Sequence, residues 1–506
     1  RASDWSSDVC SSDLLPLLSF LISSSAFTWP PSYTIRGTWK VPYTNLSNSI
    51  LVVHEPKRQY TSELNGLLRQ WNTGPEERIH RKIITAYDKE ICYNYPTDGV
   101  WDIEMTEFLP DPEGFEEQPG LYQYNGKECK MYMKVLDTEK TQTWKMYIDN
   151  ENGHPVAYVA QAISIYGSHY DVYKLEIDEF QPFALSGVWD IPSLCDDATP
   201  DPYPGEQYNL FFPKKGSFNV QLENTRKSNV NHALRFSHMN NKTWLKNIVP
   251  NLKQRKNLMK MKKFADGVED ICEEWPASNV KINSSEFPES FSWRDYPGIV
   301  GKPRDQVACG SCWAFGTAEL LESQFAIKYG KFREVSVNQI LDCTWDAENY
   351  GCQGGEVGPA LSSLKYKNMK IATEEEYPYL GLSGICEKEI RNPLGSIKKC
   401  YHIRSTTDAV KKALLKFGPL AISINVIEEM SLYTSGVFDN EQCTGTDSEM
   451  IHIVQLTGWK VIDGKEAWEV KNSWSTYWGD EGYIYIQSKN QEWNCEIGRA
   501  SCRERV

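Results

Sequence analysis

The chain has 506 residues, of which 40% are hydrophobic and 24% are charged, and its formal net charge at pH 7 is -14. At roughly 150 residues per domain this length predicts about three domains, and the composition excludes collagen-like, fibrous and disordered chains. The acidic balance disfavours a nucleic-acid partner, because a protein neutralises phosphates with a basic surface. We therefore expect several hydrophobic cores in a protein that binds no nucleic acid.

A short apolar stretch near the start predicts the secretory route. Residues 15–22 (LPLLSFLI) are too few to span a bilayer, and small residues follow at 24–26, so residues 15–26 are typical of the end of a signal peptide. Fourteen cysteines and three glycosylation sequons agree with a lysosomal or an extracellular, digestive location. No other apolar run approaches membrane length, so no membrane span is expected. The sequons lie at Asn45, Asn241 and Asn283.

Both ends of the sequence look like translated sequencing adapters. The stretch DWSSDVCSSDL opens the chain, and EIGRASCRERV closes it. We expect residues 1–14 and 496–506 to be artefacts of transcript assembly. Cys10 and Cys502 are therefore left out of the disulfides that we predict.

An all-β domain is expected after the signal peptide. From about residue 29 to residue 212, aromatic and β-branched residues alternate with polar ones between Gly, Asn and Asp turns. Asn-Gly pairs at 125–126 and 152–153 are typical of hairpin turns. We place this domain at residues 27–215.

Two cysteines and a linker are also expected there. Cys92 and Cys129 are a plausible disulfide within the β domain. A proline-rich, acidic stretch at residues 195–205 indicates an exposed linker at the domain boundary. From residue 222 to residue 270 the sequence turns polar and basic, which predicts a helical segment that packs on another domain. Globular patterning resumes at Phe287.

Cys312 is the candidate nucleophile. It lies in QVACGSCWAF and is followed by apolar residues at helical spacing up to Gly330, which is placed to end the helix. A thiol at the start of a helix is expected to ionise readily, because the unpaired N–H groups and the helix dipole favour an anion. The alternative for an isolated cysteine is a disulfide or an inert buried thiol.

The base that would serve Cys312 is one of two histidines after Phe287. His402 lies in a polar stretch, whereas His452 lies in an apolar strand. An Asp463-Gly464 turn folds that strand onto a second one, which brings Asn472 close to His452 in cross-strand register. Cys312, His452 and Asn472 then form a catalytic triad.

These motifs resemble the papain-like cysteine proteases over residues 287–495. FPESFSWRD is similar to the family's mature N-terminus, CGSCWAF contains the nucleophile, and KNSWSTYWGDEGY contains Asn472. The resemblance implies an α+β catalytic domain of two lobes, one helical and one a β-barrel, with no cofactor and no metal. It further implies that Gln306 supplies an oxyanion-hole side chain and that Trp474 shields the Asn472–His452 contact from water.

The resemblance also implies substrate-binding residues and disulfides. Gly316, Val337 and Ile451 depart from the residues that are usual in the family. The residue that would form the floor of the substrate-specificity pocket lies after Cys495, where the predicted adapter sequence replaces the natural one. Five cysteines stay without an assigned pair, namely Cys92, Cys129, Cys195, Cys272 and Cys400. The implied substrate-binding residues are Gly354, Gly355, Val357, Ser423, Met450, Ile451 and Trp474. The implied disulfides are Cys309–Cys352, Cys343–Cys386 and Cys443–Cys495.

Residues 216–286 resemble a cathepsin L-like propeptide, which would inhibit the protease from within the same chain. The alternative is an ordinary polar linker helix. The order of β domain, propeptide and protease is similar to that of the long invertebrate 26/29 kDa cysteine proteinases, whose two parts stay associated after cleavage.

The expected function is a cysteine endopeptidase that acts on proteins and peptides. One alternative is a dipeptidyl exopeptidase resembling cathepsin C. Another is a non-catalytic ligand-binding protein. Cleavage of peptides with blocked and with free amino ends would separate the two enzyme types.

Overall fold

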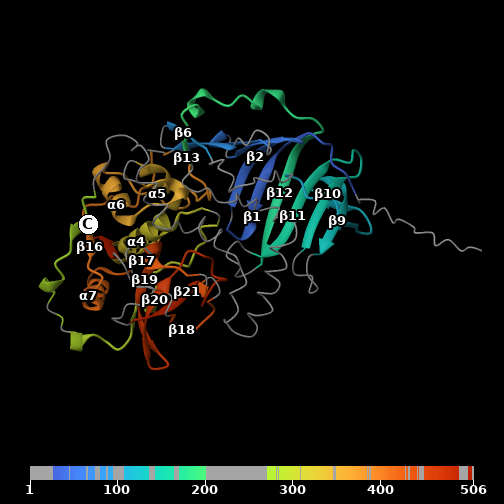
Figure 1. The fold of residues 1–506 in the computed structure, drawn as a ribbon. Coiled ribbons are helices and arrows are strands. Elements are labelled where there is room, and N and C mark those ends of the chain that lie inside the picture. Colours follow the sequence, from blue (N-terminus) through green and yellow to red (C-terminus); the bar gives the residue numbers. More distant parts are fainter. Residues whose placement is uncertain are drawn as a thin grey trace, which may run out of the picture.

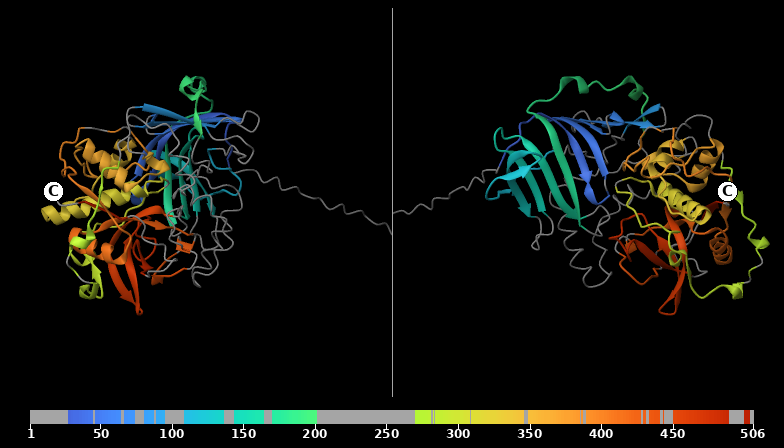
Figure 2. Two further views of the ribbon diagram at one scale, coloured as in Figure 1. Left: turned by 60° about the vertical axis from the view of Figure 1, so that its left-hand side comes forward. Right: turned by 180° about the vertical axis from the view of Figure 1, so that it is seen from behind.

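The computed structural model places an all-β N-terminal region beside a C-terminal α+β region (Figures 1 and 2). The all-β prediction for the N-terminal region is therefore confirmed. Residues 1–26, the segment 201–269 that holds most of the predicted propeptide, Asn45, Asn241, Asn283 and Cys495 lie outside the described residues. The structure describes residues 27–94, 108–200 and 270–503, apart from 45, 64–65, 74–79, 87–88, 136–142, 164–169, 281, 283, 308, 346–348, 385, 387–388, 428, 431–432, 441–442, 444–449 and 489–499.

The N-terminal region is one long sheet. Its strand order is β13-β6-β5-β4-β3-β2-β1-β12-β11-β10-β9-β7, with β8 paired to β9, and neighbours are antiparallel except for β13 and β6. The strands are β1 (Tyr33–Val41), β2 (Leu46–Glu55), β3 (Arg58–Glu63), β4 (Leu68–Thr73), β5 (His80–Ala86), β6 (Lys89–Asn94), β7 (Glu116–Glu117), β8 (Tyr122–Tyr124), β9 (Lys127–Val135), β10 (Thr143–Asp149), β11 (Pro155–Ile163), β12 (Tyr170–Gln181) and β13 (Thr199–Pro200).

Alternation of buried and exposed side chains builds this sheet, as in β10, where every second residue from Trp144 onward is buried. The Asn125-Gly126 turn joins β8 to β9 with positive φ at both residues, 48° and 76°, as the sequence predicts. Aromatic and aliphatic side chains on one face, among them Tyr33 and Tyr158, form one hydrophobic core of this region, and a second core includes Val53, Tyr60 and Trp71.

The predicted disulfide between Cys92 and Cys129 is wrong. Cys92 on β6 is bonded to Cys195, and Cys129 on β9 is a buried free thiol. Eight strands lie between β6 and β9, so the two residues are separated by roughly 40 Å along the sheet, far beyond disulfide reach. Cys195 is buried in a 3₁₀ turn at Ser193–Cys195, so the expected exposed linker does not begin there.

Among its described residues, the C-terminal region combines four α-helices with a second sheet of order β14-β16-β22-β17-β19-β20-β21-β18, in which β15 also pairs with β19. This region also has 3₁₀ turns at Ala277–Asn279, Ser284–Glu286, Trp293–Asp295 and Gly351–Gln353, and the N-terminal region has further ones at Pro42–Thr44 and Ser186–Val188. The elements are β14 (Glu273–Glu274), β15 (Phe291–Ser292), α4 (Cys312–Tyr329), α5 (Val337–Cys343), α6 (Val357–Tyr366), β16 (Cys400–Ile403), α7 (Thr407–Phe417), β17 (Leu420–Asn425), β18 (Val437–Phe438), β19 (Met450–Ile462), β20 (Lys465–Lys471), β21 (Tyr483–Gln487) and β22 (Ala500–Arg503).

Two hydrophobic cores lie in this region. One gathers side chains of α4, α5 and α6, and the other gathers those of α7 and strands β17 to β21. The helix α4 begins at Cys312 and ends before Gly330, which has φ 68°, as the sequence predicts. Every residue from Cys312 to Ala326 is buried, so this helix is enclosed on all sides rather than along one stripe.

A segment ahead of Phe287 is fastened to β16. The strand β14 runs parallel to β16, and a disulfide joins Cys272 to Cys400. Asp270 Oδ2 lies 2.9 Å from Nε2 of His402, which is buried in β16. Burial raises the pKa of Asp270, but hydrogen bonds from His402 and from the Cys272 N–H outweigh it, so the pKa of Asp270 is lowered.

The chain that follows Phe287 is fastened to β20 through Glu469, which is fully buried. Ser292 donates a hydrogen bond to this carboxylate, Lys460 Nζ lies 2.7 Å from its Oε1, and Arg294 Nη1 lies 3.3 Å from the same oxygen. Burial raises the pKa of Glu469, but the hydrogen bonds from Lys460 and Ser292 outweigh it and lower the pKa. Glu469 therefore acts as an ionised anchor for this segment.

The strand β22 lies within the segment that we expect to derive from an adapter. Its four residues pair with β16 and, at Ala500 and Ser501, with β17. The origin of residues 496–506 stays a prediction. Among the described residues, no helix combines the length and the apolar character that crossing a bilayer requires.

Candidate active site

Cys312 is the first residue of α4, preceded by Ser311 as the N-cap. Its side chain is 1% exposed, and it carries a thiol rather than a disulfide sulfur. The N-terminal end of an α-helix stabilises negative charge, so the backbone favours the thiolate form that a nucleophile needs.

His452 and Asn472 face each other across the β19–β20 hairpin. Their side chains are buried, and His452 Nε2 lies 2.7 Å from Asn472 Oδ1. Asn472 Oδ1 also accepts from the Ser473 N–H at 2.8 Å, which identifies that atom as the amide oxygen. An oxygen only accepts, so Nε2 carries the proton, and Nδ1 is the nitrogen that can exchange a proton with a thiol. The Trp474 ring lies 5.0 Å from the imidazole and is fully buried, which excludes water from the pair.

The first turn of α4 packs directly on β19. A Cβ built on Gly316 would lie 2.5 Å from Ile453 Cγ2, and Ile453 follows His452 in sequence. A larger residue at position 316 would overlap Ile453, so this close approach depends on glycine. The contact places the helix turn that starts with Cys312 against the strand that carries His452.

Gln306 is fully buried and held on three sides. Its backbone N–H donates to Ser473 O at 3.0 Å, its Nε2 donates to Cys309 O at 3.0 Å, and its Oε1 accepts from Ser473 Oγ at 2.7 Å. Ser473 was not among the residues predicted from the sequence. Its position directly after Asn472 is the one signal that could have indicated it.

Comparison with known proteins identifies the family. Residues 287–504 match the family described as papain family cysteine protease. Pro-cathepsin H of Medicago truncatula is 30% identical over 290 residues, which cover 56% of this chain and 78% of that protein. The chain belongs to the papain family of cysteine proteases.

Other proteins are also similar to this chain. Thiol protease aleurain-like of Arabidopsis thaliana is 29% identical over 56% of this chain and 76% of that protein, and Cysteine proteinase 2 of Zea mays is 37% identical over 40% of this chain and 56% of that protein. Among solved structures, the proform of the ragweed pollen allergen Amb a 11 matches with a TM-score of 0.48 at 27% identity, covering 60% of this chain and 92% of that one. The family assignment makes the chain a cysteine-type peptidase.

Two glycines line the loop that the papain-family resemblance assigns to substrate. Gly354 has φ 113°, and a Cβ built on Gly355 would lie 2.7 Å from the Trp313 ring. Trp313 directly follows Cys312, so the loop approaches the start of α4 as closely as a residue without a side chain allows. Val357 begins α6 and is 5% exposed, and Ser423 on β17 is 9% exposed. Met450 and Ile451 begin β19.

The disulfides that the resemblance implies lie around this loop. Cys309–Cys352 and Cys343–Cys386 are bonded in the structure. The first joins the Gln306 loop to the glycine loop, and the Gly310 N–H reinforces it by donating to Cys352 O at 2.9 Å. Cys443 is also disulfide-bonded. Its expected partner, Cys495, lies outside the described residues.

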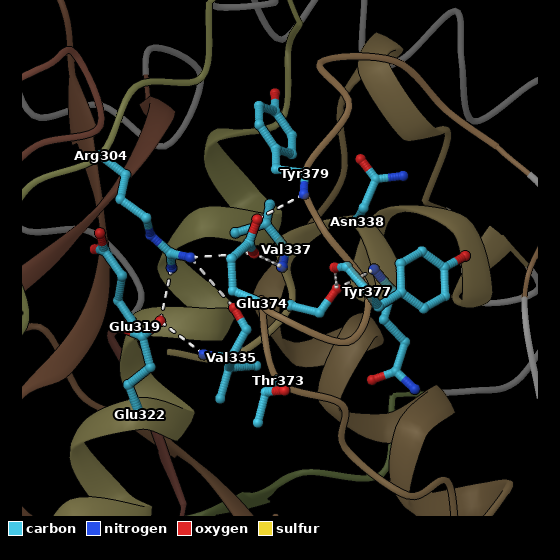
Figure 3. A network of polar contacts seen from close by, with 12 residues as sticks. Arg304, Glu319, Glu322, Val335, Val337, Asn338, Thr373, Glu374, Tyr377 and Tyr379 are labelled. Carbon is cyan, nitrogen blue, oxygen red and sulfur yellow. Dashed lines mark hydrogen bonds and ion pairs between the residues drawn. The ribbon is translucent and has the colours of Figure 1, made fainter. Parts of the chain in front are cut away.

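Two carboxylates hold Arg304, which lies two residues before Gln306. Arg304 Nη2 is 2.8 Å from Glu322 Oε1 on α4, and Nη1 is 3.4 Å from Glu374 Oε2 (Figure 3). Glu374 in turn accepts from the Tyr379 N–H at 2.5 Å. Burial raises the pKa of Glu374, and Arg304 opposes this effect without cancelling it. These contacts fix the loop that leads into Gln306.

A second buried ion pair adjoins Asn472. Lys471 Nζ lies 3.1 Å from Glu319 Oε1 on α4, and both side chains are buried. Burial raises the pKa of Glu319, and Lys471 and Arg304 lower it by less. The pair joins α4 to the end of β20, where Asn472 follows. Sequence patterning did not predict it, because Glu319 and Lys471 stand at positions that alternation or helical spacing would assign to solvent.

His402, the other candidate base, lies elsewhere. It is on β16 with Asp270, and these two residues and Cys272 place ligand-type atoms within 4.8 Å of one another. Cys272 is disulfide-bonded to Cys400 and has no thiolate to offer, so the group does not form a metal site.

Proposed function

We propose that this papain-family protease is an endopeptidase whose catalytic residues are Cys312, His452, Asn472 and Gln306. The observation that carries the proposal is the buried hydrogen bond of 2.7 Å between His452 and Asn472, in a chain whose Cys312 thiol begins α4. A nucleophile at a helix N-terminus and a base oriented by a third residue form the arrangement that covalent catalysis needs.

The reaction follows from these roles. The Cys312 sulfur, as thiolate, attacks the peptide carbonyl carbon, and the His452 imidazolium gives its proton to the leaving amine as the C–N bond breaks. Water, deprotonated by the now neutral His452, then attacks the thioester carbonyl, and cleavage of the C–S bond releases the acid and restores the Cys312 thiolate and the His452 imidazolium. Asn472 keeps the imidazole in the tautomer and orientation that both steps require.

The negative charge that develops on the carbonyl oxygen needs donors. Gln306 Nε2 has two N–H groups, one of which donates to Cys309 O, and we assign the other to the oxyanion together with the Cys312 backbone N–H. Gly354, Gly355, Val357, Ser423, Met450, Ile451 and Trp474 are the residues that we propose to contact substrate.

We further propose that the protein is made as a zymogen in the lysosomal or vacuolar secretory route, with residues 216–286 as its inhibitor. Relatives named pro-cathepsin H support this proposal. The separate cores of the helices α4 to α6 and of the second sheet support two lobes with the active site between them.

The test compares the parent with Cys312→Ala after acid treatment, on a protein substrate and on peptides with blocked or free amino ends. We expect the parent to cleave the protein and the blocked peptides, and Cys312→Ala to lose about 10⁴-fold or more. Labelling by an epoxide probe should vanish with the thiol. Cleavage by Cys312→Ala at a tenth of the parent rate would exclude Cys312 as the nucleophile, and activity on free amino ends alone would show an exopeptidase.

A further inference from the structure

Val307, the residue after Gln306, has an unfavourable backbone conformation. Its φ is 51°, and its side chain is 4% exposed. A β-branched residue at positive φ is strained and persists only where its surroundings hold it. The loop from Gln306 to Cys309 therefore needs support from outside itself.

That support comes from the N-terminal region. Val307 belongs to the hydrophobic core of the first sheet, with Tyr33, Ile35 and Leu46, and Tyr379 packs against the same core. A side chain from the catalytic region thus completes the core of a domain that is distant in sequence. Its burial there offsets the strain at Val307.

Tyr379 connects this contact to the oxyanion loop. Its hydroxyl donates to Gln306 O at 2.8 Å and lies 2.8 Å from Ser311 Oγ at the N-cap of α4. Its ring packs at 5.0 Å on that of Phe315, and its backbone N–H is held by Glu374 (Figure 3). Tyr379 therefore contacts both the residue that would bind the oxyanion and the turn that carries Cys312.

Two residues of the β2 strand contact the residues that follow Tyr379. Asn48 Nδ2 donates to Leu380 O at 2.9 Å, and Asn48 is fully buried although it is polar. A Cβ built on Gly381 would lie 3.3 Å from Leu46 Cδ1. Ser47, between Leu46 and Asn48, points to the opposite face of β2 and is exposed.

From these contacts we propose that the N-terminal β region positions the oxyanion loop of the protease. Leu46 and Asn48 hold the Tyr379–Gly381 segment, Tyr379 holds Gln306 O, and the shared core keeps Val307 at positive φ. The inference rests on the proposed catalytic role of Gln306. Tyr379 and Val307 are positioning residues that act through Gln306.

Loss of this support should lower kcat and leave KM nearly unchanged, because an oxyanion donor acts mainly in the transition state. The test uses the full chain after activation, with Asn48→Ala and Leu46→Ala as variants and Ser47→Thr, which keeps the sequon at Asn45, as the matched control on the same strand. We expect kcat to fall about tenfold in each variant, less than complete removal of an oxyanion donor. The rate of Cys312 alkylation by iodoacetamide should stay at the parent value, because alkylation forms no oxyanion.

Repeating the β2 substitutions in a Val307→Gly chain distinguishes a positioning effect on the loop from a general loss of folded structure. Glycine adopts positive φ without strain, so the Val307→Gly loop should need less support. In the Val307→Gly chain, Asn48→Ala and Leu46→Ala should then lower kcat by less than about threefold. Such a smaller loss is expected when the two changes act on the same loop, because their effects are then not additive. Two results would overturn the proposal. One is an equal loss of kcat in the parent chain and in the Val307→Gly chain. The other is a kcat that the β2 substitutions leave unchanged in the parent chain.

Failure of the proposed function gives a different result. If Cys312→Ala retains activity, the catalytic assignment itself is wrong. If the parent depends on Cys312 while Asn48→Ala and Leu46→Ala match Ser47→Thr, the catalytic assignment stands and the role of the β region is rejected.

Discussion

The Ser473 hydroxyl lies 2.7 Å from Gln306 Oε1 and donates to it. Since the Ser473 backbone carbonyl also accepts from the Gln306 N–H, one residue fixes both the backbone and the amide of Gln306. The amide nitrogen is thereby turned toward Cys309 and the start of α4. Gln306 would bind an oxyanion only in this orientation.

Ser473→Ala should lower kcat about tenfold, because the Gln306 amide then loses the donor that keeps its oxygen in place. Ser473→Thr, which keeps a hydroxyl, should restore most of the activity. The measurement is kcat on a blocked peptide alongside the rate of thiol alkylation. A fall in alkylation as large as the fall in kcat would indicate damage to Cys312 and His452 instead.

Asn472→Ala should lower both kcat and the alkylation rate, by about 10²-fold in kcat, because the imidazole loses the acceptor that sets its tautomer. Gln306→Ala is the matched contrast, since it should cost kcat roughly 10²-fold with little effect on alkylation. Alkylation followed against pH distinguishes the two variants. If the alkylation rates of the two variants depended on pH in the same way, Asn472 and Gln306 could not have the different roles of orienting the base and binding the oxyanion.

Gly316→Ala should destabilise the catalytic region by about 1–3 kcal/mol, because the added methyl group overlaps Ile453 Cγ2 in a filled core. The loss should appear in the thermal unfolding midpoint. It should occur even though alanine favours helices more than glycine does.

Ile453→Ala supplies the control for that clash. Combined with Gly316→Ala, it removes the overlapping atom, so the double variant should be more stable than the sum of the single changes predicts. Additive losses would mean that the two side chains do not compete for the same space.

Glu469→Gln should loosen the segment that contains Ser292 and Arg294. The pKa of Glu469 is lowered in the folded state, so the ionised carboxylate stabilises the protein above its unfolded pKa of about 4.3. That contribution is lost as the pH falls through the lowered folded value. We therefore expect faster amide exchange of the segment in the variant at pH 7 and a difference that shrinks as the pH falls below about 4.3. A difference that stays the same down to the lowest pH at which the protein remains folded would contradict the role of charge.

The Cys272–Cys400 disulfide predicts how processing fragments stay together. A single cut between Cys272 and Phe287 should leave one species on a non-reducing gel and two species after reduction. Cys400→Ser should allow separation under denaturing conditions without reductant. Fragments that separate from the parent without reductant, after a cut mapped to that interval, would show that the disulfide is absent from the protein.

Local patterns in the sequence predicted the parts of the site that are built by neighbouring residues. The helix Cys312–Tyr329 follows from its spacing and from Gly330 as its C-cap. The Asp463-Gly464 turn sets the register that brings Asn472 to His452. Both depend on residues close together in the chain.

Contacts between distant segments were not predictable in this way. The pairing of Cys92 with Cys195 depends on where the chain returns after β12, and no local pattern carries that information. Likewise, neither the strain at Val307 nor the contacts of Tyr379 can be seen in the sequence, because both arise where segments distant in the sequence meet.

The contact between Asn48 and Leu380 spans 332 positions of the chain. We expect this separation to determine which region of the protein folds first. Because domains form as units during synthesis, we expect the N-terminal sheet to form before Val307 leaves the ribosome, with the place in its core that Val307 later fills still open. Contacts of such long range form late, since a large loop must close first. On refolding from denaturant, the thiol at the start of α4 should therefore become reactive before peptide turnover returns, with the delay set by docking of the two regions.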